Sequence, residues 1–222
     1  MKGVLLVYKG VMFDMDNTLL SSTIDFKRMR KDCFQVVTKY YEEGSTLFSP
    51  DTAAPAEMIE WGKKQGNKTG NHAMVEEMLA CVEECEKEGM KEAALEPGAK
   101  EVLSYLLTKK YHVVVVTNNA TASAEYALKR TGVDHLFKDI IGRDKMKALK
   151  PSSDSVMSVL KKNPAIPAKG WLMVGDSWID GKAANGADVP FILYKGQREE
   201  IREKGVKLLS HIQHLNELYK IC

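Results

Sequence analysis

Two aspartates, Asp14 and Asp16, directly follow the apolar run at residues 11–13. If that run is a strand, its side chains alternate between two faces, and both carboxylates start out on the same side. Two like charges aimed into one small volume are costly unless something positive lies beside them. A divalent cation and a lysine are the usual solutions, and the cation would also hold a phosphate against one carboxylate. The motif alone is weak, because a loop of surface acids with a helix cap has the same pattern.

Polar residues also follow two later apolar runs. Residues 112–116 are β-branched and lead into Thr117 and Asn118, and residues 171–174 lead into Gly175 and Asp176. These strand patterns alternate with helical patterns, which predicts an α/β fold with a parallel sheet between two layers of helices. In such sheets ligands bind outside the carboxyl ends of the strands. We therefore expect one crevice to contain Asp14, Asp16, Thr117, Asn118, Asp176 and Lys150.

The segment between the first strand and residue 96 has a different pattern. Apolar residues recur at three- and four-residue steps from Phe26 to Tyr40 and again from Met74 to Cys85, and Pro55 is typical of a helix start. We therefore expect an all-helical domain at residues 21–95. It would be inserted into a core formed by residues 1–20 and 96–222.

The remaining elements are predicted from the same periodicities. We expect helices around residues 102–107, 126–128, 156–160 and 215–219, and strands around residues 140–141 and 191–193.

Composition narrows the class of partner. The chain has 222 residues, a formal net charge of +2 and 44% hydrophobic residues. This charge gives no basic field that would favour nucleic acid, so small ligands are expected instead. Four scattered cysteines suggest a reducing compartment, and no apolar stretch reaches the roughly 20 residues that span a bilayer. We expect a cytoplasmic protein that does not bind membranes, and the sequence does not indicate its oligomeric state.

Four segments together resemble the motifs of the haloacid dehalogenase-like hydrolase superfamily. The chain is most similar to the phosphatase branch with a helical (C1-type) cap, and within it to phosphoglycolate phosphatases. The resemblance covers nearly the whole chain and implies a Rossmann-like core. The four segments are Asp14-Met15-Asp16-Asn17-Thr18, Thr117-Asn118, Lys150-Pro151 and Gly175-Asp176-Ser177-Trp178-Ile179-Asp180.

The resemblance implies a reaction on phosphomonoesters. Asp14 would be the nucleophile that forms an aspartyl-phosphate, and Asp16 would be the general acid and then the general base. The Thr117 hydroxyl, the Asn118 backbone N–H and the Lys150 ammonium would bind the phosphoryl oxygens. The expected substrate is a small phosphorylated metabolite.

The resemblance also implies a Mg²⁺ cofactor. Its ligands would be a carboxylate oxygen of Asp14, the backbone carbonyl of Asp16 and the carboxylate of Asp176, with Asp180 in a supporting position. The helical domain would act as the cap that contacts the leaving group of the substrate.

Three positions depart from the family's usual residues. Asn17 stands where Gly is common, Gly181 where an aliphatic residue is frequent, and Asp188 where Gly is often present. None of them removes a side chain that the chemistry needs.

Other functions remain open at this point. A dehalogenase would lack the second acid of the first motif, so Asp16 argues against it. A phosphosugar mutase of the same superfamily needs proton transfer from the cap, where no such residue is identified. A phospho-acceptor signalling domain would carry an adjacent acid pair and no helical insertion. A catalytically silent binding protein would have little reason to keep all the reactive groups.

Overall fold

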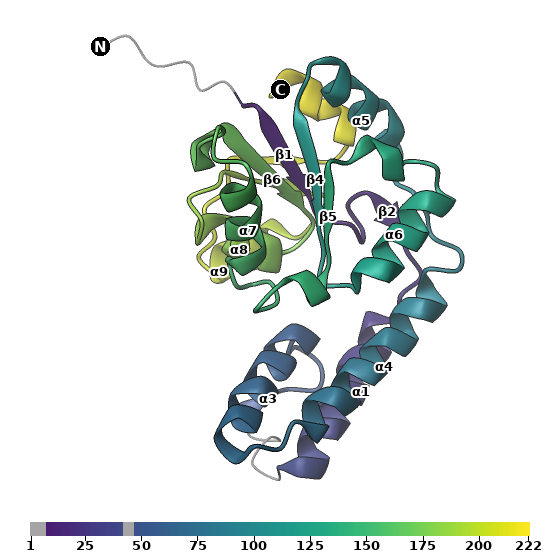
Figure 1. Ribbon diagram of the computed structural model, residues 1–222, viewed down its shortest axis with the longest axis vertical. Helices are drawn as coiled ribbons and strands as arrows, with labels where there is room; N and C mark the ends of the chain where they lie inside the picture. The colour runs from purple at the N-terminus through teal and green to yellow at the C-terminus, as the bar shows by residue number, and fades with distance from the viewer. Residues whose placement is uncertain (1–7, 42–46) are drawn as a thin grey trace. The chain divides into compact units, whose positions relative to one another are not determined.

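The protein folds into two compact units (Figure 1). The computed structural model describes residues 8–41 and 47–222. One unit comprises Met1–Ser22 and Ala93–Cys222, and the other is the helical insertion Thr23–Glu92. The two units are described separately below.

The larger unit contains a parallel sheet of six strands in the order β5-β4-β1-β6-β7-β8. β1 lies in the middle, between β4 and β6, so the direction in which successive strands are added reverses here. The prediction of a parallel, Rossmann-like sheet is confirmed. The strands are β1 (Gly10–Phe13), β4 (His112–Val116), β5 (Asp139–Ile141), β6 (Trp171–Gly175), β7 (Phe191–Tyr194) and β8 (Ser210–Ile212).

Helices cover both faces of this sheet. Figure 1 shows α5 and α6 on one side of the strands and α7 and α8 on the other. The α-helices are α5 (Ala99–Thr108), α6 (Thr121–Arg130), α7 (Asp154–Lys162), α8 (Trp178–Asn185) and α9 (Arg198–Glu203). Four short 3₁₀ helices accompany them: η1 (Asp134–Leu136), η2 (Arg143–Lys145), η3 (Ala168–Gly170) and η4 (Leu215–Lys220).

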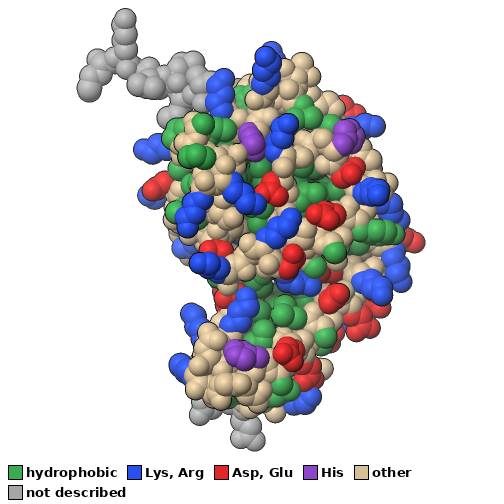
Figure 2. Space-filling view, viewed as in Figure 1, with side chains coloured by type: hydrophobic (Ala, Val, Ile, Leu, Met, Phe, Trp, Pro, Cys, Tyr) green, Lys and Arg blue, Asp and Glu red, His purple; other side chains and the backbone are tan. Residues whose placement is uncertain are grey.

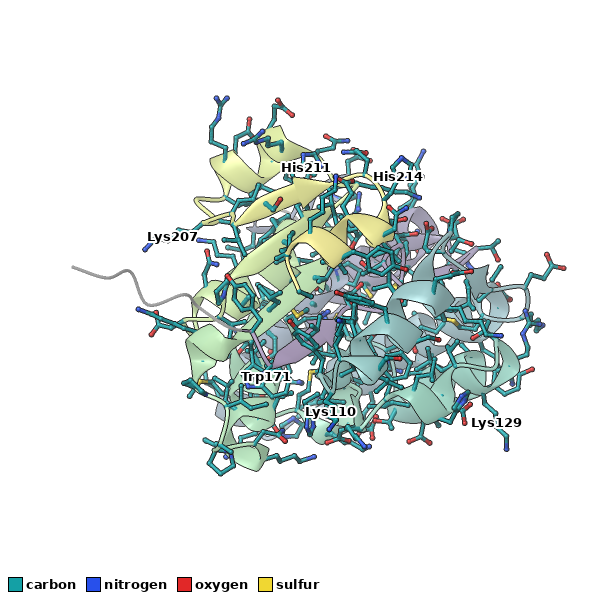
Figure 3. The ribbon with its side chains drawn as sticks, turned by 90° about the horizontal axis from the view of Figure 1, so that it is seen from above. Lys110, Lys129, Trp171, Lys207, His211 and His214 are labelled. Carbon is teal, nitrogen blue, oxygen red and sulfur yellow. The ribbon has the colours of Figure 1, made fainter. Side chains whose placement is uncertain are left out.

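The central strands form the core because both of their faces are covered. Every residue of β1 and β6 is buried, which explains why these strands are continuous apolar runs rather than alternating ones. Trp171 begins β6 and is fully buried, with its ring 5.5 Å from that of His112. Figure 3 looks onto this amino end of the sheet and labels Trp171. The polar residues named above follow the opposite ends of the strands.

Two short antiparallel strands pair where the chain leaves the larger unit and where it returns. β2 (Leu20–Ser21), where the chain leaves the larger unit, pairs with β3 (Ala94–Leu95), where it returns. Glu96 follows β3 and accepts hydrogen bonds from Tyr194 Oη and Lys195 Nζ, both at 2.7 Å. The returning chain is thereby tied to the carboxyl end of β7.

The smaller unit is entirely helical in its described residues, as the periodicities predict. α1 (Phe26–Tyr40), α3 (Pro55–Thr69) and α4 (Ala73–Gly89) pack against one another. The buried side chains of α1 and α4 recur at three- and four-residue steps, so each helix turns one apolar stripe inward. On α1 these side chains are Met29, Cys33, Val36 and Val37. On α4 they include Met74, Val75, Met78, Val82 and Cys85.

Lys and Arg side chains are interspersed with Asp and Glu on the face drawn in Figure 2. All four cysteines are free. In residues 8–41 and 47–222, no helix has both the length and the apolar character to cross a membrane.

Candidate active site

Three neighbouring strands end at the candidate site. Asp14 follows β1, Thr117 follows β4 and Asp176 follows β6. The parallel register pairs the last residue of β1 with Val115 and Val174, so the three strand ends lie side by side. The Asp14 backbone N–H continues the ladder to the Val174 carbonyl at 2.9 Å. The strand geometry thus brings these side chains to one edge of the sheet, as expected.

Lys150 reaches this edge from the loop before α7. Its Nζ donates to Asp14 Oδ1 and Asp180 Oδ1, each at 2.6 Å, and to the Val116 carbonyl at 2.8 Å. An ammonium has three donors, and all three are used. The residue is 2% exposed, so its charge is held in a fixed place among the acids.

Asn118 fixes the backbone of that lysine. Its side-chain Nδ2 donates to the Lys150 carbonyl, and the Lys150 backbone N–H donates to Asn118 Oδ1, both at 2.9 Å. No local pattern in the sequence indicates these two hydrogen bonds. The role predicted for Asn118, a backbone N–H on a phosphoryl oxygen, stays a prediction.

Asp180 is already satisfied by the protein. Its Oδ1 accepts from Lys150, and its Oδ2 accepts from the backbone N–H and hydroxyl of Ser177 in the capping box at the start of α8. A Cβ on Gly175 would lie 2.5 Å from Asp180 Oδ2, so only glycine lets the strand end approach this carboxylate so closely. With both oxygens occupied, Asp180 is suited to a supporting position.

Three carboxylates form a group that can hold a metal ion. Oxygens of Asp14, Asp176 and Asp180 lie within 4.8 Å of one another. Among the described residues, the Asp176 side chain has no hydrogen bond or ion pair, so it is available as a ligand. Oxygen ligands of this kind suit a hard cation such as Mg²⁺. The Asp16 carboxylate is outside this group, and the role expected for its backbone carbonyl stays a prediction.

The pKa shifts of these buried groups also indicate a site for a cation. Burial raises the pKa of Asp14 to about 7, and the neighbouring acids Asp180 and Asp16 add to this effect while Lys150 opposes it. Burial and the charges of Asp14 and Asp180 also raise the pKa of Asp176. Burial disfavours the charged form of Lys150, but the adjacent carboxylates outweigh it and raise its pKa. One lysine therefore does not neutralise these acids, and a bound cation would.

Asp16 lies beside this group in a different environment. Burial raises its pKa to about 6. The Ser22 hydroxyl and the Asn119 amide oppose this rise in pKa. Asp16 Oδ2 accepts a hydrogen bond from Asn119 Nδ2 at 2.8 Å, while the buried Oδ1 makes no hydrogen bond of normal geometry in the described part of the chain. Asn119 was not among the predicted site residues, although it belongs to the polar run that follows β4.

Thr117 is buried at the end of β4. Its Oγ1 accepts a hydrogen bond from the Asn119 backbone N–H at 3.1 Å. The hydroxyl proton is therefore available to donate to another group. The contact of this hydroxyl with a phosphoryl oxygen stays a prediction.

Backbone conformation at two positions and side-chain packing at the third explain the three departures from the family pattern. Asn17 and Asp188 have φ angles of 56° and 55°. Asn and Asp tolerate this left-handed region better than other residues with a Cβ, so each can stand where glycine is common. A Cβ on Gly181 would overlap the side chain of Val206, which accounts for glycine on that helix.

Sequence comparisons agree with this geometry. Residues 11–194 match the family described as haloacid dehalogenase-like hydrolase. A phosphoglycolate phosphatase of Pasteurella multocida is 28% identical over 191 residues, covering 81% of this chain and 82% of that protein. A phosphoglycolate phosphatase of Cereibacter sphaeroides is 26% identical over 219 residues, covering 94% of this chain and 95% of the relative.

Solved structures share the fold. The crystal structure of a predicted phosphatase from Clostridium acetobutylicum matches with a TM-score of 0.69 and 22% identity, covering 97% of this chain and 98% of that one. That of a predicted phosphoglycolate phosphatase from Haemophilus somnus matches with a TM-score of 0.65 and 21% identity, covering 96% and 97%. The family match spans most of the chain and includes all four motifs, so the chain belongs to the haloacid dehalogenase-like hydrolases.

Proposed function

We propose that this protein is a Mg²⁺-dependent phosphatase that hydrolyses a small phosphomonoester through an aspartyl-phosphate on Asp14. The observation that carries the proposal is the position of Asp14. It lies 2.6 Å from the ammonium of Lys150 and in one oxygen cluster with Asp176. A carboxylate in that position lies beside one fixed positive charge and in a group that could hold a cation, which together would offset the charge of an approaching phosphate dianion.

In the first step, an oxygen of Asp14 attacks phosphorus as the bond to the leaving oxygen breaks. Asp16 gives its proton to that oxygen, so the product leaves as a neutral alcohol. The Thr117 hydroxyl and the Asn118 backbone N–H bind the other phosphoryl oxygens, and Lys150 joins them by exchanging one of its three contacts within the protein for a phosphoryl oxygen. The charge that builds up on these oxygens is thereby neutralised in place.

In the second step, water hydrolyses the aspartyl-phosphate. Asp16, now a carboxylate, takes a proton from the water as its oxygen attacks phosphorus. The bond between phosphorus and the Asp14 oxygen breaks, which releases phosphate and restores the free carboxylate. One acid is therefore used as nucleophile and the other as proton shuttle.

Asp14, Asp176 and the backbone carbonyl of Asp16 would hold Mg²⁺, and Asp180 would orient this arrangement through Lys150 and Ser177. When bound, the ion supplies positive charge to the carboxylates and to the phosphoryl group. The helical insertion, residues 21–95 in the predicted division, is assigned the role of a substrate-selecting cap.

Relatives named phosphoglycolate phosphatase support a small phosphorylated metabolite as substrate. The candidates are phosphoglycolate, sugar phosphates and nucleoside monophosphates. The test is phosphate release from a panel of these esters with Mg²⁺ present, using Asp14→Asn as the inactive control. Turnover of at least one ester by the wild type alone is expected. No release from any ester, or equal release by the variant, would contradict the proposal.

A further inference from the structure

The Asn119 side chain donates a hydrogen bond to Asp16, the proposed proton shuttle. Its Nδ2 lies 2.8 Å from Asp16 Oδ2, and the contact joins residues 103 positions apart in the chain. We propose that Asn119 is a positioning residue that fixes the Asp16 carboxylate so that Oδ1 is the oxygen facing the leaving group and the attacking water. This inference rests on the proposed function and deepens it.

The backbone of Asn119 is itself held on both sides. Its N–H donates to Thr117 Oγ1 at 3.1 Å, and its carbonyl accepts from the Arg143 backbone N–H at 2.8 Å. The residue is 6% exposed. A buried amide anchored in this way has little freedom to follow a moving partner, so it defines where Asp16 Oδ2 lies.

The amide also distinguishes the two oxygens of Asp16. An Asn Nδ2 group has donors and no acceptor, so Oδ2 must remain an acceptor while the contact persists. The proton that leaves and returns during turnover must therefore be exchanged at Oδ1. That oxygen is buried and makes no hydrogen bond of normal geometry among the described residues, although the Ser22 hydroxyl lies near the carboxyl and lowers its pKa. It therefore has room for a hydrogen bond from a reacting group.

A purely structural role for Asn119 predicts a different outcome from a positioning role. Loss of folding support lowers activity toward all substrates alike. Loss of Asp16 orientation harms the step in which a proton must reach the leaving oxygen. An alkoxide needs that proton, whereas p-nitrophenolate leaves readily without it.

The experiment compares kcat/KM for an alkyl phosphate, chosen from the esters that the wild type turns over, with kcat/KM for p-nitrophenyl phosphate. This constant reports the steps up to departure of the leaving group. In Asn119→Ala we expect kcat/KM to fall by about 100-fold for the alkyl ester and by less than about 5-fold for the aryl ester. The Ki of inorganic phosphate should stay unchanged, because Asn119 does not bind the phosphoryl group.

Two further variants make the comparison secure. Asn119→Leu fills a similar space without a donor and should reproduce the selective loss, even if Asn119→Ala fails to fold. Asn163→Ala removes an amide that donates to the Val159 carbonyl at 2.9 Å at the far end of α7, and it should leave both constants unchanged. Circular dichroism and melting temperature verify folding in each case.

The possible failures are distinguishable. If the wild type is active and folded Asn119 variants lose both constants equally, or lose neither, the positioning role is wrong and the proposed function stands. If the wild type hydrolyses neither kind of ester, the proposed function is wrong and the role of Asn119 falls with it.

Discussion

Lys150 Nζ lies 2.6 Å from Asp14 Oδ1, although 136 positions separate the two residues in the chain. The same nitrogen lies 2.6 Å from Asp180 Oδ1, and both pairs are buried. This lysine is therefore a fixed positive charge that joins Asp14 at the end of β1, Asp180 on α8 and the Val116 carbonyl at the end of β4. Several consequences of this arrangement are measurable.

Replacing Lys150 with Met should remove both activity and stability. Breaking a buried ion pair leaves uncompensated charge, which costs about 3–5 kcal/mol of unfolding free energy. Loss of a donor to the phosphoryl oxygens should lower kcat by at least about 100-fold. Urea denaturation and steady-state kinetics measure the two effects.

The matched control is Lys162→Met, which breaks the exposed pair between Lys162 and Asp139, also at 2.6 Å. A solvated pair contributes little, so its loss should change stability by less than about 1 kcal/mol and leave activity intact. Equal stability losses in the two variants would show that the buried position of Lys150 is unimportant.

Chelation should abolish activity, and added Mg²⁺ should restore it and raise the melting temperature. Asp176→Asn should weaken this response, raising the Mg²⁺ concentration for half-maximal activity by about 10-fold or more, because the variant loses a ligand without other partners in the described chain. A magnesium titration followed by activity and by thermal unfolding measures both. Full activity in exhaustively metal-free protein would exclude the assigned role of these acids.

The stability of the metal-free protein should fall as the pH rises toward neutrality. Burial raises the pKa of Asp14 to about 7 and that of Asp16 to about 6, whereas carboxyl groups of an unfolded chain titrate near about 3.9. The folded state therefore binds protons more tightly. This contribution is fully present below about pH 4 and is lost as the pH rises through the two folded-state pKa values.

Denaturation between about pH 5 and 8 should accordingly show a steeper decline for metal-free wild type than for Asp14→Asn, whose amide does not titrate. Saturating Mg²⁺ should flatten the wild-type profile. Identical slopes for wild type and variant would mean that Asp14 does not titrate in this range.

Gly175→Ala should impair the site without touching a proposed catalytic group. The added Cβ would lie 2.5 Å from Asp180 Oδ2, so the carboxylate must move away from Ser177 or Lys150. We expect a loss of about 1–3 kcal/mol in unfolding free energy and a drop in kcat. Gly132→Ala is a useful comparison, because that glycine has open space around it but a φ of 73°, so it reports backbone strain alone. If Gly175→Ala is as active as wild type, the close approach is tolerated and Asp180 is not held as described.

The strand ends were predictable because each apolar run stops abruptly at polar residues, as at Asp14 and Thr117. Lys150 was expected in the same crevice, and the resemblance to the family supplied its role. The helix at residues 198–203 was not predicted, because Ile201 is its only buried residue and the segment shows no apolar periodicity. Strand β8 is short and lies at the edge of the sheet, and its residues carry no clear alternation.

Contacts that depend on tertiary structure were also beyond the sequence. The hydrogen bonds between Asn118 and the Lys150 backbone and the bond from Asn119 to Asp16 join residues 32 and 103 positions apart. Nothing in the local pattern pairs them. The closing segment is helical as predicted, but it is a 3₁₀ helix over Leu215–Lys220.

In the proposed mechanism Asp14 carries the phosphoryl group while Asp16 moves the protons. In Asp16→Asn the nucleophile is intact but the general base is missing, so an activated ester should phosphorylate the protein and hydrolysis of the intermediate should stall. Intact-protein mass spectrometry after acid quench should find one added phosphoryl group in Asp16→Asn. It should find none in the double variant Asp14→Asn, Asp16→Asn. A phosphoryl group on the double variant would place the nucleophile elsewhere and contradict the mechanism.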